Sequence, residues 1–192
     1  MAHAHATAGI KQSILAGARS IEHGTFLDDE VIELLVEHGT WLIPTIYIGD
    51  YYYEKGTLRE DERNNYYMEH ERPVWVEWLN KAHRKGVKIG VGVDFGGEGY
   101  ETKDFAGEIR MLLDIGMSNM EAIQAATRVN AEMLQWDDTG TLENGKRADI
   151  IAVPGNPLED IRALENVSFV MQGGRIVKSP DDADPLPGTL AQ

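Results

Sequence analysis

The 192-residue sequence contains no cysteine, which excludes disulfide bonds and thiol chemistry. Lysine and arginine total only 18 against 32 acidic residues, a net charge of −14. Nucleic acids and anionic membranes need clustered cations, so neither is expected as a partner. Apolar runs fall well short of the roughly 20 residues of a membrane-spanning helix. The N-terminal stretch MAHAHATAGI also lacks the charged and apolar regions of a signal peptide. We therefore expect a cytoplasmic protein.

The remaining composition is that of a globular protein, with 42% hydrophobic and 26% charged residues. The pattern divides the chain into three parts. Residues 1–135 alternate strands and helices, residues 136–178 contain short strands joined by glycine turns, and residues 179–192 are rich in proline and aspartate. We expect the last part to be a flexible tail.

Hydrophobic periodicity predicts the elements of the first part. We expect strands at residues 18–22, 41–46 and 87–93, and helices at residues 7–16, 27–39, 60–85 and, with a break near Gly116, 104–135. Ser118 is the expected N-cap after that break. This alternation is typical of a parallel sheet with crossover helices. In the second part, the Gln-Gly-Gly at 172–174 indicates a hairpin of a small antiparallel sheet.

Polar side chains stand at the ends of the expected strands. His3 and His5 lie in a first short strand, His23 ends the second, and Asp94 ends the fourth. In a (β/α)8 barrel, reactive groups project from these ends. Imidazole and carboxylate suit zinc, manganese or iron, and a bound metal lowers the pKa of water toward neutrality. Asp94 could both bind the metal and accept a proton from that water.

Each of these residues also has a simpler explanation. A single histidine at a strand end is more often a hydrogen-bonded surface or core residue, and the HAHA next to Met1 could be the remnant of a tag. Asp94 could cap a helix or form a turn. The joint pattern favours a metal site, because three separate strand ends carry ligand types. Tyr47, just after the third strand, is a candidate for the substrate pocket. The run at 51–53 either lines that pocket or covers a loop.

Several segments resemble a known family. They are HAHATAGIKQSILAGARSIEHGTFLDDE at 3–30, GVGVDFG at 90–96, AIQAATRVNAEML at 122–134, TGTLENGKRADIIAVPGNPLEDI at 139–161 and VMQGGRIV at 170–177. Together they resemble the amidohydrolase superfamily, in the branch of imidazolonepropionase-like enzymes and Xaa-Pro dipeptidases, from the fifth barrel strand onward. The resemblance implies an α/β fold: the C-terminal half of a TIM-like (β/α)8 barrel plus part of a small β-sandwich.

The resemblance also implies roles for individual residues. His3 and His23 match metal ligands of the fifth and sixth strands, and Asp94 matches the eighth-strand residue that contacts the metal and transfers protons. His5 matches a position that supports the site or binds substrate. The cofactor implied is a divalent metal, first of all zinc, as one or two ions. The activity implied is hydrolysis of an amide or peptide C–N bond, such as that of a dipeptide, with Asp94 and His23 as catalytic residues.

Parts of the family pattern are missing. The His-X-His of the first strand and the lysine of the fourth strand have no counterpart, Ala6 replaces a common glycine, and Phe95 departs from the usual serine. A four-stranded half-barrel would leave strand edges and one sheet face uncovered. We therefore expect the chain to pair with a separate N-terminal half or with a second copy, unless it is a piece of a longer protein. Two alternatives stay open: a cyclic amide hydrolase or deaminase of the same superfamily, and an inactive fragment or assembly partner.

Overall fold

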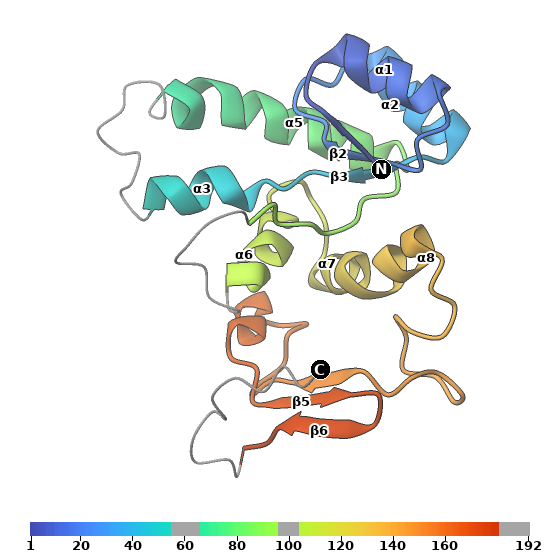
Figure 1. Cartoon of the computed structure of the whole chain (residues 1–192). Coiled ribbons are helices and arrows are strands. Elements are labelled where there is room, and N and C mark those ends of the chain that lie inside the picture. The colour runs from blue at the N-terminus through green and yellow to red at the C-terminus, as the bar shows by residue number, and fades with distance from the viewer. Residues whose placement is uncertain (55–65, 96–103, 181–192) are drawn as a thin grey trace.

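The computed structural model describes residues 1–54, 66–95 and 104–180. Its N-terminal part contains a parallel sheet of three short strands, β1 (Ala2–Ala4), β2 (Ser20–His23) and β3 (Trp41–Ile43), in that spatial order. Helix α1 (Thr7–Leu15) connects the first two strands, and α2 (Asp29–His38) connects the next two. The expected parallel sheet with crossover helices is confirmed for these strands (Figure 1).

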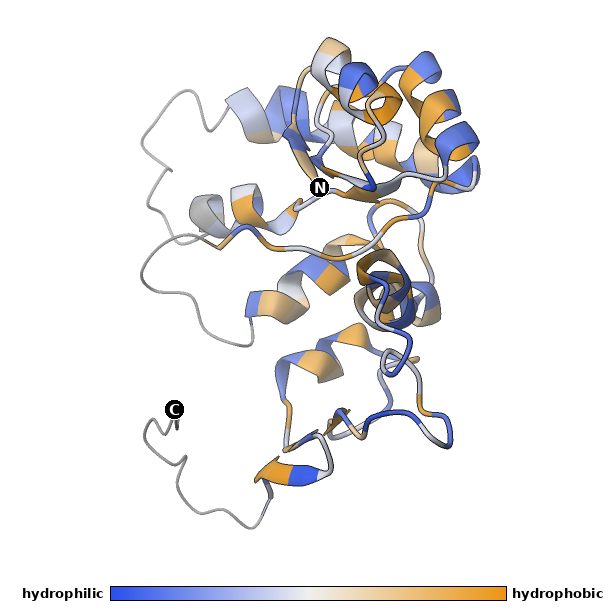
Figure 2. Cartoon of the chain, turned by 45° about the vertical axis from the view of Figure 1, so that its right-hand side comes forward, coloured by the Kyte–Doolittle hydropathy of each residue, from blue (hydrophilic) through white to orange (hydrophobic). Residues whose placement is uncertain are grey.

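Local signals account for the bounds of α2. The Asp28 carboxylate accepts a hydrogen bond from the Val31 backbone N–H at 2.7 Å, which caps the helix start. Gly39 ends the helix in the left-handed conformation, at φ 62°. Both α1 and α2 carry hydrophobic and hydrophilic residues on different sides (Figure 2). Their apolar sides enter one core, whose fully buried members include Ile10, Ile14, Ile21, Val31, Leu35, Leu42 and Leu79.

After β3 the chain forms a helix where the sequence suggested only a tyrosine-rich segment. This helix, α3 (Tyr47–Glu54), is followed after the undescribed residues 55–65 by a π-helical turn at Tyr67–Glu71 and by α5 (Arg72–Arg84). The predicted helix at 60–85 is confirmed over its described part, while its beginning lies outside the described residues. The Arg72 guanidinium joins α5 to α3 through two bonds to the buried Asp50 carboxylate, at 2.6 and 2.7 Å.

The predicted fourth strand at 87–93 is wrong in its extent. Ile89 forms a single parallel bridge to Leu42 of β3, supported by two backbone hydrogen bonds of 2.8 and 3.0 Å, and no strand is assigned there. The Asn130 side chain bonds the edge of this segment that faces away from β3. Its Oδ1 accepts the Val91 N–H at 3.0 Å, and its Nδ2 donates to the Val91 carbonyl oxygen at 2.8 Å.

The helices of residues 104–135 are confirmed as two groups separated around Gly116. Helix α6 spans Asp104–Met111, and α7 (Asn119–Gln124) continues through a π-helical turn at Ala125–Val129 into α8 (Asn130–Leu134). Ser118 is the N-cap of α7, as expected: its hydroxyl accepts from the Glu121 N–H, and the Glu121 carboxylate accepts from the Ser118 N–H.

The C-terminal part is a three-stranded antiparallel sheet of β4 (Ile150–Ala152), β5 (Phe169–Gln172) and β6 (Arg175–Lys178), with a 3-10 helix at Ile161–Glu165 before β5. The predicted hairpin is confirmed, because Gly173 and Gly174 form its turn at positive φ. This sheet lies at the opposite end of the molecule from β1–β3, with α6, α7 and α8 between them (Figure 1).

The α/β content agrees with the expected class, whereas closure into a barrel and the sandwich stay predictions, as do the domain boundaries. Among the described residues, β1 pairs with β2 alone and β4 with β5 alone. Most of the expected flexible tail, residues 181–192, lies outside the described residues. The described helices include none with the length and apolar character that a membrane crossing requires.

Candidate metal centre

The register of the parallel sheet brings two of the predicted ligands together. Ala4 of β1 stands beside His23 of β2, and His3 stands beside Glu22. The chain turns sharply after β2, since His23 has φ 74° and Gly24 has φ 61°. This turn is tied back to β1 by a 3.0 Å bond from the Gly24 N–H to the Ala4 carbonyl oxygen. Both side chains therefore reach the carboxyl end of the sheet, where active sites of parallel α/β folds form.

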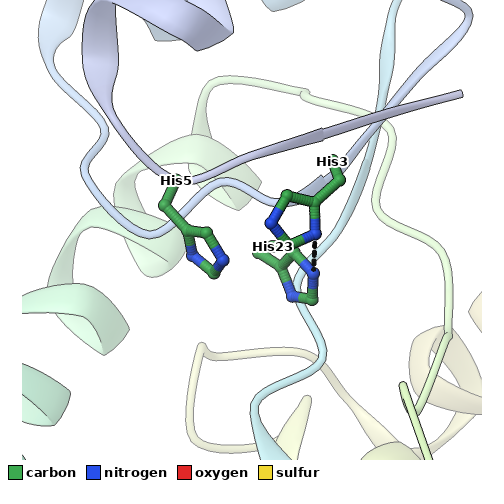
Figure 3. A group of neighbouring side chains, drawn as sticks. All are labelled: His3, His5 and His23. Carbon is green, nitrogen blue, oxygen red and sulfur yellow. Dashed lines mark hydrogen bonds between the residues drawn. The ribbon is translucent and has the colours of Figure 1, made fainter. Parts of the chain in front are cut away.

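Three imidazole rings gather at this edge: His3, His5 and His23, the histidine cluster (Figure 3). The Nδ1 of His3 lies 2.9 Å from the Nε2 of His23, with the two rings perpendicular to each other. The His5 ring stacks on the His23 ring at 4.5 Å and 11°. One nitrogen from each ring falls within 4.8 Å of the others. His5, expected beside the site, thus lies within reach of the same ion as the two predicted ligands.

Hydrogen bonds around His23 favour one position for its ring proton. The Thr45 hydroxyl lies 2.6 Å from the Pro44 carbonyl oxygen, to which it can donate its single hydrogen. With that hydrogen donated, the same hydroxyl oxygen, 2.7 Å from His23 Nδ1, accepts from that nitrogen. In the neutral ring, Nε2 then carries the lone pair that faces His3. Such an outer hydrogen bond is what orients a metal-binding histidine.

The electrostatic setting favours the neutral rings of His5 and His23. Burial lowers the pKa of His23, and the neighbouring His5 and His3 lower it further, while the Asp94 carboxylate acts in the opposite direction. Burial and His3 likewise lower the pKa of His5. Neutral imidazole is the form that binds metals, because the protonated ring has no free lone pair.

Asp94 lies at the border of the cluster, with Oδ2 4.0 Å from the Nε2 of His23. Its side chain is 61% exposed, and its backbone has φ 51°, an uncommon conformation for a residue other than glycine. The position follows from the Ile89 bridge to β3 and from the Asn130 bonds to Val91. The structure thus places the predicted carboxylate beside the histidines, where solvent reaches it.

The donor set suits a divalent transition metal. Two imidazole nitrogens bound to one tetrahedral zinc at about 2.0–2.1 Å would stand about 3.3 Å apart. The 2.9 Å between His3 and His23 nitrogens is close to that separation, so a small outward movement of either ring would accommodate an ion. His5 and Asp94 offer a third nitrogen and a carboxylate oxygen nearby. The residues present therefore fit a zinc-type ion bound mainly by histidines.

Tyr47, the predicted substrate-binding residue, is largely buried against α6. It begins α3, is 7% exposed, and packs its ring against Tyr51 at 5.9 Å. A Cβ added at Gly107 would come within 2.4 Å of the Tyr47 ring, which shows how closely α6 covers it. The expected contact between Tyr47 and substrate stays a prediction.

One buried carboxylate near the site gave no signal in the sequence. Glu108, on α6, is completely buried and accepts hydrogen bonds from the backbone N–H groups of Ile46 at 3.0 Å and Tyr47 at 2.7 Å. Burial raises its pKa to about 7, against the lowering effect of those hydrogen bonds. A glutamate in the middle of an amphipathic helix looks like a surface residue. Only the tertiary structure shows that Glu108 is buried against the start of α3.

A groove of the described residues lies elsewhere. It has about 780 Å³, lies between α7–α8 and β4, and is lined mainly by apolar side chains that include Ile123, Leu134, Trp136 and Ile150. None of the cluster histidines borders it. Bond cleavage needs ionisable or metal-binding groups that converge on one point, and the histidine cluster supplies them.

Comparisons with known proteins show the family to which the chain belongs. The profile of the amidohydrolase family matches residues 1–177. Ochratoxinase from Aspergillus niger is 32% identical over 189 residues, which cover 93% of this chain and 38% of that protein. The structure of a Xaa-Pro dipeptidase with bound methionine superimposes with a TM-score of 0.81 at 40% identity, covering 92% of this chain and 44% of the other. A putative prolidase from Bifidobacterium longum gives 0.80 at 34% identity, covering 97% and 47%. The chain spans less than half the length of each.

Proposed function

This chain belongs to the amidohydrolase family, and from that premise we propose that it contributes the metal ligands of an enzyme that hydrolyses amide C–N bonds. The observation that carries the proposal is the convergence of three imidazole nitrogens within 4.8 Å at the carboxyl end of a parallel sheet, with a carboxylate 4.0 Å away. His3 and His23 would hold a divalent metal, with zinc as the first choice and room for a second ion in the complete site.

The residues suggest how the reaction proceeds. A divalent metal, when bound, supplies a Lewis acid that acidifies water and polarises the substrate carbonyl. Asp94, solvent-exposed and beside His23, accepts a proton from the attacking water as the new C–O bond forms. It then returns that proton to the amide nitrogen as the C–N bond breaks, which yields a carboxylic acid and an amine. His23, whose Nδ1 lies 2.7 Å from the Thr45 hydroxyl, would bind through Nε2 the metal that polarises the carbonyl.

The substrate class follows from the relatives rather than from this chain alone. Their names describe a Xaa-Pro dipeptidase, a putative prolidase and an ochratoxinase. We propose a dipeptide or a related small amide as substrate. His5, an exposed member of the histidine cluster, would contact the substrate directly. Tyr47 would contribute only through the small part of its ring that α6 leaves uncovered.

A second candidate, from a different class, is an assembly role. The unpaired outer sides of β1 and β4 among the described strands favour it, as do the exposed apolar side chains Trp136, Leu142 and Ile151 beside the groove. In that case the chain would complete its fold on a separate N-terminal half or on a second copy. Its histidines would bind metal weakly or not at all.

Native mass spectrometry on the purified chain distinguishes the two, because it reads assembly and metal content together. An assembly that carries about one zinc per chain and cleaves a Xaa-Pro dipeptide supports the enzyme. A metal-free species without turnover, alone and after addition of zinc, supports the assembly role.

The site itself is tested by His23→Ala, with His70→Ala as the matched control, since His70 is an exposed histidine that contacts Glu69 and the Tyr66 ring. We expect His23→Ala to lower turnover, or zinc affinity where the chain is measured alone, by more than about tenfold. A smaller loss, or an equal loss in the control, would argue against His23 as a ligand.

A further inference from the structure

A buried carboxylate holds the turn that follows β3. Glu108 lies on α6, 61 and 62 positions beyond its two partners, yet both its oxygens accept backbone N–H groups there, Oε1 from Ile46 and Oε2 from Tyr47. Its side chain is completely buried. Burying a carboxylate costs free energy unless hydrogen bonds compensate. A buried carboxylate at this place therefore indicates a role beyond filling space.

The turn that Glu108 holds is strained. Thr45, directly before these two N–H groups, is 4% exposed and has φ 53°. A β-branched residue rarely adopts this left-handed conformation, and it persists only where the surroundings fix the backbone on both sides. On one side Pro44 restricts the chain, and its carbonyl oxygen takes the hydroxyl hydrogen of Thr45. On the other side the Glu108 carboxylate holds the backbone N–H groups of Ile46 and Tyr47.

The strained conformation aims the Thr45 hydroxyl at the metal centre. Its oxygen lies 2.7 Å from His23 Nδ1 and, because its hydrogen is already donated, can only accept there. This leaves the Nε2 lone pair of His23 directed at His3. The path from carboxylate to ligand therefore runs from Glu108 through the backbone of Thr45–Tyr47 and the Thr45 hydroxyl to His23.

We infer that Glu108 is a positioning residue for the metal ligand His23: it fixes the turn after β3 so that Thr45 holds the His23 ring in its Nδ1–H form with Nε2 available to a metal. The inference rests on the proposed metal-dependent function for its purpose, although not for its geometry. A carboxylate that serves only as a cap for the start of α3 would stabilise that helix without any influence on the His23 ring.

The experiment reads the His23 ring directly. Long-range ¹H–¹⁵N correlation NMR on the 192-residue chain, labelled at histidine and measured without metal, assigns the protonated nitrogen of each ring. We expect the wild-type His23 ring in the Nδ1–H form. An Nε2–H form in the wild type would overturn the inference before any variant is made.

Glu108→Gln keeps the side chain's size but leaves one acceptor in place of two. We expect His23 to populate both ring forms in this variant, and Zn²⁺ affinity, measured by competition with a coloured chelator, to fall about tenfold or more. Thr45→Val, which removes the hydroxyl, should reproduce the change in ring form. The matched control is Glu121→Gln, which also removes a carboxylate from a helix start, that of α7, and should leave both readings unchanged.

The opposite result is equally clear. A folded Glu108→Gln with the wild-type His23 ring form and a Zn²⁺ affinity within about twofold would show that Glu108 is a helix cap alone. If amide spectra show Glu108→Gln unfolded, Glu108→Asp decides in the same way, because its shorter carboxylate cannot reach both N–H groups. A wild type that binds no Zn²⁺ would count against the proposed function, whereas the ring forms would still decide the role of Glu108.

Discussion

Asn130→Ala removes both hydrogen bonds from the Asn130 side chain to Val91, in the segment leading to Asp94. Its amide bonds the Val91 N–H at 3.0 Å and the Val91 carbonyl at 2.8 Å, and Val91 is only 5% exposed. Gly90 allows this close approach, since a Cβ there would meet the Asn130 oxygen at 2.4 Å. With alanine in place, water has little access to either backbone group, so both are left without a partner.

The magnitude follows from the number of groups affected. A hydrogen bond contributes about 1 kcal/mol net, and a buried group left unsatisfied costs about 1–3 kcal/mol. For two backbone groups, with partial relaxation, we expect Asn130→Ala to lower the free energy of unfolding by about 2–4 kcal/mol. Asn130→Asp should also destabilise, because it keeps the acceptor for the Val91 N–H but turns a carboxylate oxygen toward the Val91 carbonyl.

Urea unfolding followed by far-ultraviolet circular dichroism measures this loss. The control is Asn119→Ala, which removes a single bond from an exposed asparagine to the Leu158 carbonyl oxygen and should cost less than about 1 kcal/mol. Equal losses for Asn130→Ala and Asn119→Ala would refute the reasoning. They would mean that neighbouring strands, and not the Asn130 amide, fix Val91 and with it the position of Asp94.

Further predictions concern charge and pH. The pKa of Glu108 is raised to about 7, so the folded state holds its proton more tightly than the unfolded chain. The resulting stabilisation, up to about 3 kcal/mol, is complete below pH 4.5 and is lost as the pH rises through 7. Glu108→Gln should remove this pH dependence of the free energy of unfolding, measured by urea titration at each pH. Arg72→Ala leaves the buried Asp50 carboxylate unpaired and should cost about 3–5 kcal/mol in thermal or urea unfolding; a smaller loss for Arg72→Lys is expected, and no loss for either would contradict the pairing. Because the pKa values of His5 and His23 are lowered, Zn²⁺ binding should persist at pH 6.5 and weaken only in more acidic solution; a steep loss between pH 7.5 and 6.5 by chelator competition would argue that the rings are not held neutral.

Sequence alone was sufficient for features that depend on near neighbours in the chain. Helix starts at Asp28 and Ser118, the helix end at Gly39 and the hairpin at Gly173 each rest on a few adjacent residues. For the same reason the alternation of strands and helices, and with it the parallel sheet, could be predicted from periodicity. The places of His3, His5, His23 and Asp94 at strand ends made them candidates, and the family resemblance, which rests on motifs of this local kind, implied their roles.

Tertiary structure alone decided the contacts between distant segments. His5 joins the cluster because its ring stacks on His23, 18 positions away, and no spacing rule predicts a ring orientation. Asn130 bonds Val91 from 39 positions away, and Glu108 bonds the turn after β3 from more than 60. A polar residue on a helix has the same pattern whether it faces solvent or a buried backbone N–H. Which of the two it faces is fixed only when the helix packs, and the packing depends on the whole core.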